Sequence, residues 1–134
     1  MLQPGRTKYR KQFRGKMRGE SKGNQVSFGD YGLKSLARGW ISANQIEAAR
    51  RAITHYTSRN GRVWIRLFPD KPITQKGAGA PLGAGKGDVV GYVCVVKPGK
   101  VMFEIGGVEE SIAHQALNLA ASKISLKSKI IKRK

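Results

Sequence analysis

The sequence of 134 residues contains one cysteine, Cys94, and two histidines, His55 and His114. A single cysteine excludes an internal disulfide framework, which indicates a reducing compartment. A structural zinc site needs four ligands of the cysteine or histidine type, which these three separated residues do not provide. Because no nucleophile, base and carboxylate form a catalytic pattern either, the sequence predicts no enzyme, no catalytic residue, no metal site and no cofactor.

Long hydrophobic runs are also missing. The longest mainly apolar stretch, 89–96, is too short to span a bilayer. Residues 1–12 are basic and polar and lack the apolar region of a signal peptide. We therefore expect no membrane partner.

Acidic residues are scarce: 8 Asp and Glu stand against 26 Lys and Arg, for a formal net charge of +18. The positively charged side chains repel one another in a compact chain, so a polyanionic partner is expected. Nucleic acid is favoured over an anionic membrane surface as that partner. The charge is +7 in residues 1–23, +6 in 123–134 and only +5 in 24–122. At this length we expect one domain, divided into a basic N-terminal arm (1–23), a core (24–122) and a basic C-terminal tail (123–134).

The N-terminal arm has a lysine or arginine every two or three positions. A segment this charged does not fold by itself, but it can become ordered along a phosphate backbone. The alternative is a solvated tail without a partner, which is disfavoured because basic arms are an electrostatic footprint of nucleic-acid binding. The residues predicted to contact RNA in the arm are Arg6, Lys8, Arg10, Lys11, Arg14, Lys16, Arg18 and Lys22.

The first helix is predicted from Ser42 onward. Ser42 and Gln45 form a capping box, and Asn60-Gly61 is typical of a left-handed C-cap. The residues spaced to face a core are Ile46, Ala49, Ile53 and Tyr56. Arg50 and Arg51 lie away from that stripe and are candidate RNA contacts.

The stretch 62–68 predicts a strand with one purely apolar face. Its other face sets Trp64 between Arg62 and Arg66, and all three are candidate RNA contacts. In one interpretation the indole stacks on a base or braces a phosphate. In the other it packs beneath another element while the arginines reach solvent. Because an indole is large enough to be buried on either face, both interpretations stay open.

Further strands are expected at 26–28, 89–96 and 101–105, with a type II turn at Pro98-Gly99. A second helix begins at Glu109, where acidic residues favour the helix dipole. Its expected core residues are Ile112, Ala116, Leu119 and Ala120. The apolar residues of the tail that are expected to dock are Ile124, Leu126, Ile130 and Ile131. These elements predict an α+β fold: a single domain with a mixed or antiparallel sheet, two helices, a long glycine-rich loop and basic N- and C-terminal arms.

Residues 75–87 contain five glycines. A nucleotide P-loop would need glycine and serine or threonine where the chain has Ala80 and Gly87. A strand is expected next, so no helix N-terminus follows to hold a phosphate. The whole connection, 69–88, is long for a compact domain, where such loops are usually functional or disordered. Since glycine lets the backbone approach another surface closely, we expect a functional loop rather than a linker.

Several stretches, in the right order, resemble one known family. They are MLQPGRTKYRKQFRGKMRG, SANQIEAARRAI, GRVWIRLFPDKPIT, VVKPGKVMFEIGGV and the terminal LAASK. Together they closely resemble large-subunit ribosomal protein sixteen of bacteria and organelles, the universal uL16 family, over residues 1–131.

The resemblance implies an α+β core in which a mixed sheet carries two helices. It implies a structural constituent of the large ribosomal subunit, in the cytoplasm of a bacterium or in an organelle. The implied partners are 23S-type rRNA beside the peptidyl transferase centre, A-site tRNA with P-site tRNA as a further candidate, and neighbouring ribosomal proteins. The loop 69–88 would point toward the tRNA acceptor ends, with candidate residues Lys76, Gly77, Gly79, Pro81, Leu82, Gly83, Gly85, Lys86 and Gly87.

This loop departs from the family pattern at two places. Pro81-Leu82-Gly83 stands where relatives usually have arginine-methionine-glycine, and Ala84 stands where a lysine is common. The arginine hydroxylation of some members therefore has no target here, and we expect the loop to act through shape and backbone more than charge. The alternatives are a non-ribosomal basic nucleic-acid-binding protein and, disfavoured by the failed motifs, a nucleotide-using enzyme.

Overall fold

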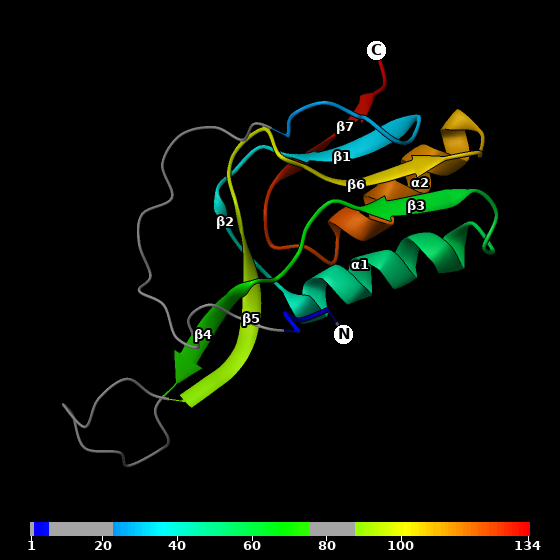
Figure 1. Ribbon diagram of the computed structural model, residues 1–134. Helices are drawn as coiled ribbons and strands as arrows, with labels where there is room; N and C mark the ends of the chain where they lie inside the picture. The colour runs from blue at the N-terminus through cyan, green and yellow to red at the C-terminus, as the bar shows by residue number, and fades with distance from the viewer. Residues whose placement is uncertain (1, 6–22, 76–87) are drawn as a thin grey trace.

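Seven strands and two helices make up the part of the chain that the computed structural model describes, residues 2–5, 23–75 and 88–134 (Figure 1). The predicted class, an α+β single domain, is confirmed. In chain order the elements are β1 (Tyr31–Ser35), β2 (Gly39–Ser42), α1 (Ala43–Tyr56), β3 (Arg62–Ile65), β4 (Lys71–Gln75), β5 (Asp88–Val96), β6 (Val101–Gly106), α2 (Glu110–Ala121) and β7 (Ser128–Lys132).

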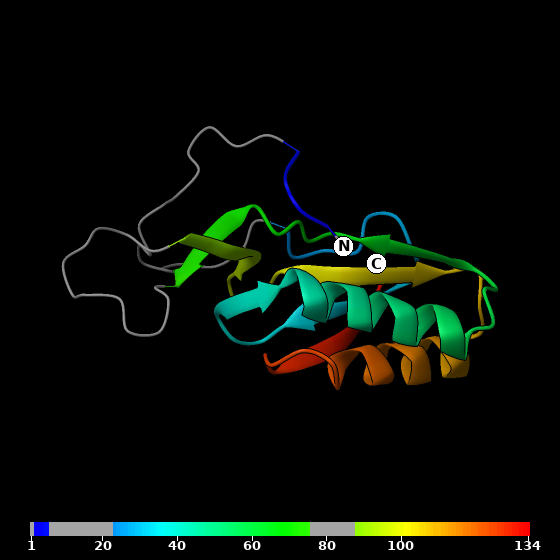
Figure 2. The same cartoon turned by 90° about the horizontal axis from the view of Figure 1, so that it is seen from below.

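The strands form two sheets. The four-stranded sheet has the order β3-β6-β1-β7, and the three-stranded sheet has the order β2-β5-β4. Every pairing between the described strands is antiparallel, so the sheet is not mixed. β4 and the adjoining end of β5 project beyond the helices at one end of the molecule (Figures 1 and 2).

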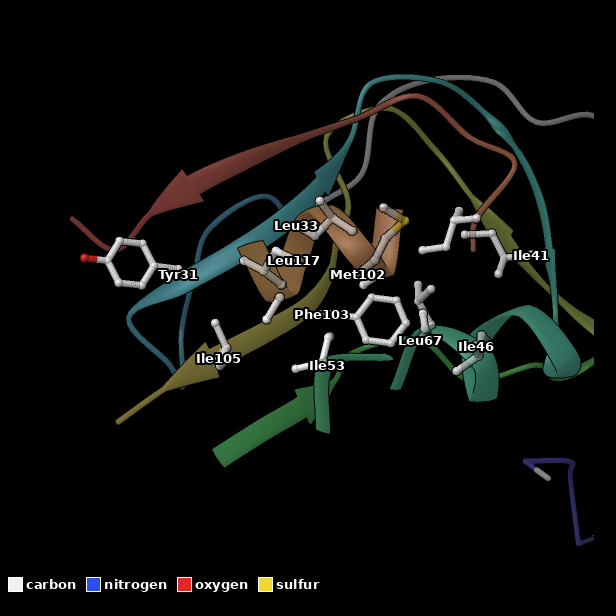
Figure 3. Packing of buried hydrophobic residues seen from close by; sticks show 14 of the residues in the cluster. Tyr31, Leu33, Ile41, Ile46, Ile53, Leu67, Met102, Phe103, Ile105 and Leu117 are labelled. Atoms are coloured by element: carbon white, nitrogen blue, oxygen red, sulfur yellow. The ribbon is translucent and has the colours of Figure 1, made fainter. Parts of the chain in front are cut away.

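The hydrophobic core lies between the four-stranded sheet and the helices, which cover one face of it side by side (Figure 2). The strand register places one apolar residue of each strand in a row across the sheet: Ile65, Phe103, Leu33 and Ile130. Phe103 is fully buried and packs with Ile53 of α1 and Leu117 of α2 in one cluster (Figure 3). Burial of these apolar surfaces is the main favourable term in folding.

α1 begins where the sequence predicts it. The hydroxyl of Ser42 accepts a hydrogen bond from the backbone N–H of Gln45 at 3.2 Å, and the Gln45 side chain accepts one from the Ser42 N–H at 3.0 Å. The predicted capping box is therefore confirmed. The predicted end at Asn60-Gly61 is wrong, because the helix stops at Tyr56 and the chain already turns at Ser58 and Arg59, whose φ angles are 52° and 65°.

The predicted core face of α1 is correct for three of its four residues: Ile46, Ala49 and Ile53 are buried. Tyr56 is 40% exposed, and its hydroxyl donates a hydrogen bond to the Gln115 side chain of α2. The reason is its place at the last position of the helix, where the hydroxyl reaches the neighbouring helix at the surface instead of the core.

α2 begins at Glu110, one residue after the predicted start. Its buried residues are Ala113, Ala116, Leu117 and Ala120. The prediction is wrong for Leu119, which is 42% exposed, and for Ile112, which is only half-buried. The spacing of the larger residues is misleading here, because close packing against α1 and the sheet favours the alanines.

Three strand predictions need correction. Residues 26–28 form no strand, because their backbone is bonded to a side chain of β6, as described below. The strand predicted at 62–68 ends at Ile65, although the N–H of Arg66 still donates to the carbonyl of Met102 at 2.9 Å. β2, at Gly39–Ser42, was not predicted. The turn at Pro98-Gly99 is confirmed, with a φ of 93° at Gly99.

The ranges predicted as loop and tail also contain strands. β4 lies within 69–88, so only 76–87 separate β4 from β5. This strand was not predicted because it contains Pro72, and proline has no N–H for the hydrogen bonds of a sheet. β4 is an edge strand, where a missing N–H is tolerated. β7 lies within 123–134 and pairs with β1, so part of the basic tail belongs to the sheet.

Candidate nucleic-acid interface

Segment 24–29 crosses the face of the four-stranded sheet opposite to the helices (Figure 2). Its anchor is Glu104 of β6, which is fully buried. One carboxylate oxygen of Glu104 accepts hydrogen bonds from the backbone N–H groups of Ser27 (3.0 Å), Phe28 (2.7 Å) and Gly29 (2.8 Å). The other oxygen pairs with the guanidinium of Arg66 at 2.9 Å. One carboxylate therefore fixes the backbone of three consecutive residues, 27–29, against the sheet.

The charge of Glu104 is stabilised by these partners. Burial raises the pKa of the carboxyl group, but the hydrogen bonds from Gly29, Phe28, Ser27 and Arg66 outweigh burial, and the net pKa lies below the usual value. A buried carboxylate persists only when it is paired and hydrogen-bonded in this way. Arg66 also donates to the carbonyl oxygen of Gln25 at 2.6 Å, which ties the start of the segment to the same pair.

Trp64 lies on the sheet face that this segment covers, since it is the register partner of Glu104. Phe28 stacks on Trp64, with ring centroids 6.3 Å apart and an interplanar angle of 21°. The guanidinium of Arg62 lies 5.5 Å from the Trp64 ring centroid, and that of Arg66 lies 5.8 Å from the Phe28 centroid. These are favourable cation–π distances.

The two rings differ in exposure: Trp64 is half-buried, whereas Phe28 is 58% exposed. Phe28 is therefore the outer ring of the pair. The sequence offers no signal for Phe28, because its exposure depends on the hydrogen bonds between its neighbours and a residue of β6. Trp64 thus has a packing partner, and the prediction that it contacts RNA remains a prediction.

A second group of basic residues lies on the outer face of α1. Glu47 accepts hydrogen bonds from Arg50 at 2.5 and 3.1 Å and from Arg51 at 3.1 Å. The hydrogen bond from Arg50 is the main reason why the pKa of Glu47 is lowered to about 2, against the opposing effect of burial. The trio keeps a net positive charge, and the shared carboxylate restricts where both guanidinium groups lie.

Two adjoining hollows open at the C-terminal end of α1. The larger, of about 560 Å³, is lined by Arg50, Arg51, Thr54, His55, Ser58 and Arg59. The smaller, of about 280 Å³, shares Arg50, Thr54 and Arg59 with it and extends to Arg62 of β3. Guanidinium and hydroxyl groups at such a concave surface are well suited to phosphate groups. Arg59 is not among the residues predicted from the sequence, although a basic residue just beyond a helix was a usable signal.

Arg62 connects the two regions of the interface. It lines the smaller hollow at α1, and it also lines a third hollow beside Phe28 and Trp64. The structure thus brings Arg50 of α1 and Arg62 of β3 to one hollow and places Arg51 at the larger one. Trp64 and Arg66 lie on the adjoining face, beneath Phe28. The remaining predicted contacts lie outside the described residues: those of the arm, from Arg6 to Lys22, and those of the loop, from Lys76 to Gly87.

Neither a metal centre nor a membrane-spanning helix is found in the described parts of the chain. No three His, Cys, Asp or Glu side chains of residues 2–5, 23–75 and 88–134 gather closely enough to hold a metal ion. Within the same residues, neither α1 nor α2 is long and apolar enough to cross a membrane.

Comparison with known proteins shows similarity along almost the whole chain. The model of the family described as Ribosomal protein L16p/L10e matches residues 4–131. The chain is 60% identical to the large ribosomal subunit protein uL16 of Kosmotoga olearia, with 99% of this chain and 95% of that protein covered. The proteins of the same name from Thermosipho melanesiensis and Lactobacillus gasseri are 58% and 54% identical, with 99% of this chain and 94% and 92% of theirs covered.

Proposed function

This chain belongs to the ribosomal protein L16p/L10e family, and we propose that it binds large-subunit rRNA through the basic surface at the end of α1 and contacts tRNA through the β4–β5 hairpin. Membership of this family makes it a structural component of the large ribosomal subunit and not an enzyme. The expected location, the bacterial cytoplasm, follows from the bacterial relatives of the same name.

The observation that carries the rRNA proposal is the convergence of arginines on the two hollows at the end of α1. Arg50, Arg59 and Arg62 come from a helix, a turn and a strand, and only the fold brings them together. Guanidinium groups form paired, charge-assisted hydrogen bonds with phosphate oxygens. The Glu47 carboxylate holds Arg50 in place, so less side-chain entropy is lost when a phosphate binds.

The N-terminal arm is proposed to extend this contact. Leu2 packs against the hydrophobic core, so the arm is attached to the core at its start and again at Gly23, whose carbonyl accepts from the N–H of Val101 at 2.8 Å. The eight basic residues between these two points are proposed to neutralise rRNA phosphates, which supplies affinity without sequence specificity.

The tRNA contact is proposed for the connection between β4 and β5. β4 pairs with residues 88–93 of β5, and this hairpin projects beyond the helices (Figure 1). The end of β4 and the start of β5, which residues 76–87 connect, therefore lie at the far end of the hairpin. Five glycines in this connection remove the side chains that would keep a backbone from an RNA surface. A-site tRNA is the main proposed partner of this connection, and P-site tRNA is proposed as a second partner.

The rRNA proposal is tested with Arg59→Ala combined with Arg62→Ala, measured against 23S-type rRNA over a range of salt concentrations. Removing one phosphate interaction should reduce the slope of log affinity against log salt by about 0.7 to 0.9. Arg133→Ala, at an exposed position just after β7, is the matched control and should leave the slope unchanged. An unchanged slope in the double variant contradicts the proposed surface.

The remaining alternative is a basic nucleic-acid-binding protein that acts outside the ribosome. Recovery of the tagged chain from cells decides between the two. Co-purification with 23S-type rRNA in large subunits supports the ribosomal function. Co-purification mainly with DNA would contradict it.

A further inference from the structure

A third hollow, of about 320 Å³, lies beside the stacked pair Phe28 and Trp64. Three chain segments meet there: the segment 28–30, the beginning of β3, and the end of β6. Glycines allow this meeting, because a Cβ on Gly61 would come within 2.5 Å of the carbonyl oxygen of Gly106, and φ at Gly61 is 73°. Gly107 donates its N–H to the carboxylate of Asp30 at 3.3 Å, which joins two of the three walls.

The walls of this hollow combine aromatic rings with charges of both signs. Phe28 presents the most exposed large hydrophobic side chain among the described residues, at 58%. Arg62 lies at the hollow with its guanidinium over the Trp64 ring, and Asp30 lines another side. An exposed aromatic ring bordered by an arginine is the arrangement with which proteins hold unpaired bases of RNA.

We propose that the hollow beside Phe28 and Trp64 holds one unpaired base of the rRNA, with Phe28 as the stacking residue and Arg62 as the contact to the phosphate next to that base. The proposal rests on the proposed rRNA binding and names a further site for it, which adjoins the arginine hollows at α1 and shares Arg62 with the smaller one. It assigns Phe28 an RNA-binding role that no sequence pattern indicates.

The charges favour a base over a phosphate inside the hollow. The carboxylate of Asp30 repels a phosphate group, whereas a base is neutral and its N–H groups can donate to a carboxylate. Arg62 belongs to this hollow and to the neighbouring arginine hollow as well. A nucleotide with its base at Phe28 therefore has its backbone directed toward the arginines that are proposed to bind phosphates.

The position of Phe28 is prepared before RNA binds. Its own N–H and those of Ser27 and Gly29 are bonded to the buried carboxylate of Glu104. Trp64 supports the ring from below. A ring held in advance binds a base with less loss of conformational entropy than a ring on a free loop.

The first test compares rRNA affinity and its salt dependence for Phe28→Ala, with Phe68→Ala as the matched control because Phe68 is 46% exposed and does not line this hollow. Loss of one stacked base should lower affinity about 5- to 150-fold. The salt slope should not change, because stacking releases no counterions. Phe28→Leu keeps an apolar group on Trp64 and should also bind more weakly, which covers the case in which the alanine variant is unstable.

The second test places the photo-crosslinking amino acid p-benzoylphenylalanine at position 28 in assembled large subunits, with position 68 as control. Crosslinks from position 28 to one or two adjacent unpaired nucleotides of 23S-type rRNA support the proposal. Crosslinks only to a neighbouring protein, or normal affinity of Phe28→Ala, overturn it. If Phe28→Ala binds normally while the combined Arg59→Ala and Arg62→Ala variant has a reduced salt slope, this site is wrong and the proposed function stands. If both variants bind rRNA with normal affinity and a normal salt slope, both the base site and the proposed rRNA-binding surface are wrong.

Discussion

Trp64 lies directly opposite Glu104 where β3 pairs with β6, so an indole and a buried carboxylate share one face of the sheet. The carboxylate binds the backbone of segment 27–29, and the indole binds the side chain of Phe28 in the same segment. The two residues therefore hold one segment through two different interactions.

Glu104→Gln should destabilise the protein. The amide removes the charge that pairs with Arg66 while Arg66 stays largely buried, with 17% of its side chain exposed. Breaking a buried ion pair by changing one partner typically costs about 3 to 5 kcal/mol. Urea unfolding measures the loss. Glu109→Gln is the control, because Glu109 is exposed and makes no capping hydrogen bond. A loss no larger than that of a surface substitution would show that Glu104 does not anchor the segment.

Stability should fall in acid, and Glu47 should account for part of the fall. Its pKa is lowered from 4.5 to about 2 in the folded state, so the ionised form stabilises the fold. That contribution is complete above the unfolded value and is lost as the pH falls from about 4.5 toward about 2. Thermal unfolding of the wild type and of Glu47→Gln, measured between pH 7 and pH 2, should differ at neutral pH and converge at the acid end. A difference that stays constant with pH contradicts the prediction.

Trp64→Ala should leave the protein folded but less stable. The indole is half-buried beneath Phe28, so the loss should be about 2 kcal/mol, below the range of about 3 to 5 kcal/mol for a fully buried aromatic residue. Phe103→Ala provides that comparison, since Phe103 is 0% exposed. Circular dichroism and thermal melting of both variants measure the difference. Unfolding of Trp64→Ala at room temperature would mean that Trp64 is mainly a core residue.

Neutralising the N-terminal arm should reduce the salt dependence of rRNA binding. Glutamine substitutions preserve the length of the arm and the packing of Leu2 on the core, which a deletion from residue 1 would remove. The substituted residues are Arg6, Lys8, Arg10, Lys11, Arg14, Lys16 and Arg18. The slope of log affinity against log salt should decrease by about 0.7 to 0.9 for each phosphate that is no longer neutralised. If the slope stays the same, the arm does not bind phosphates.

Shortening the loop within residues 77–85 should impair translation without impairing incorporation of the protein into large subunits. The arginine hollows and the core are unaffected by the change, so incorporation into large subunits should remain near normal. Binding of A-site tRNA and the rate of translation should decrease. A second variant keeps the full length of the loop and all its glycines but replaces Lys76 and Lys86 with alanine. It tests whether the backbone or the charge of the loop is needed. Normal A-site binding and normal translation by subunits with the short loop would show that the loop is only a connection.

Local sequence determined the elements whose signals are short-range. The capping box at Ser42, the turn at Pro98-Gly99 and the buried stripe from Ile46 to Ile53 all depend on neighbours a few residues apart, and all are confirmed. The excess of positive charge and the family resemblance are likewise properties of the chain itself. From these features the fold class and the membership of a ribosomal family could be predicted.

Tertiary structure alone decided the features that join distant residues. Segment 26–28 has the composition of a strand, but a carboxylate 76 residues away along the chain accepts the N–H of Phe28. The sequences of β4, which contains a proline, and of β7, which contains two lysines, did not predict strands. Their pairing with β5 and β1 shows that they are strands. The arginine hollows join a helix, a turn and a strand. A hydrogen bond to a buried charge or a pairing across a sheet depends on separation in space, which the order of residues does not state.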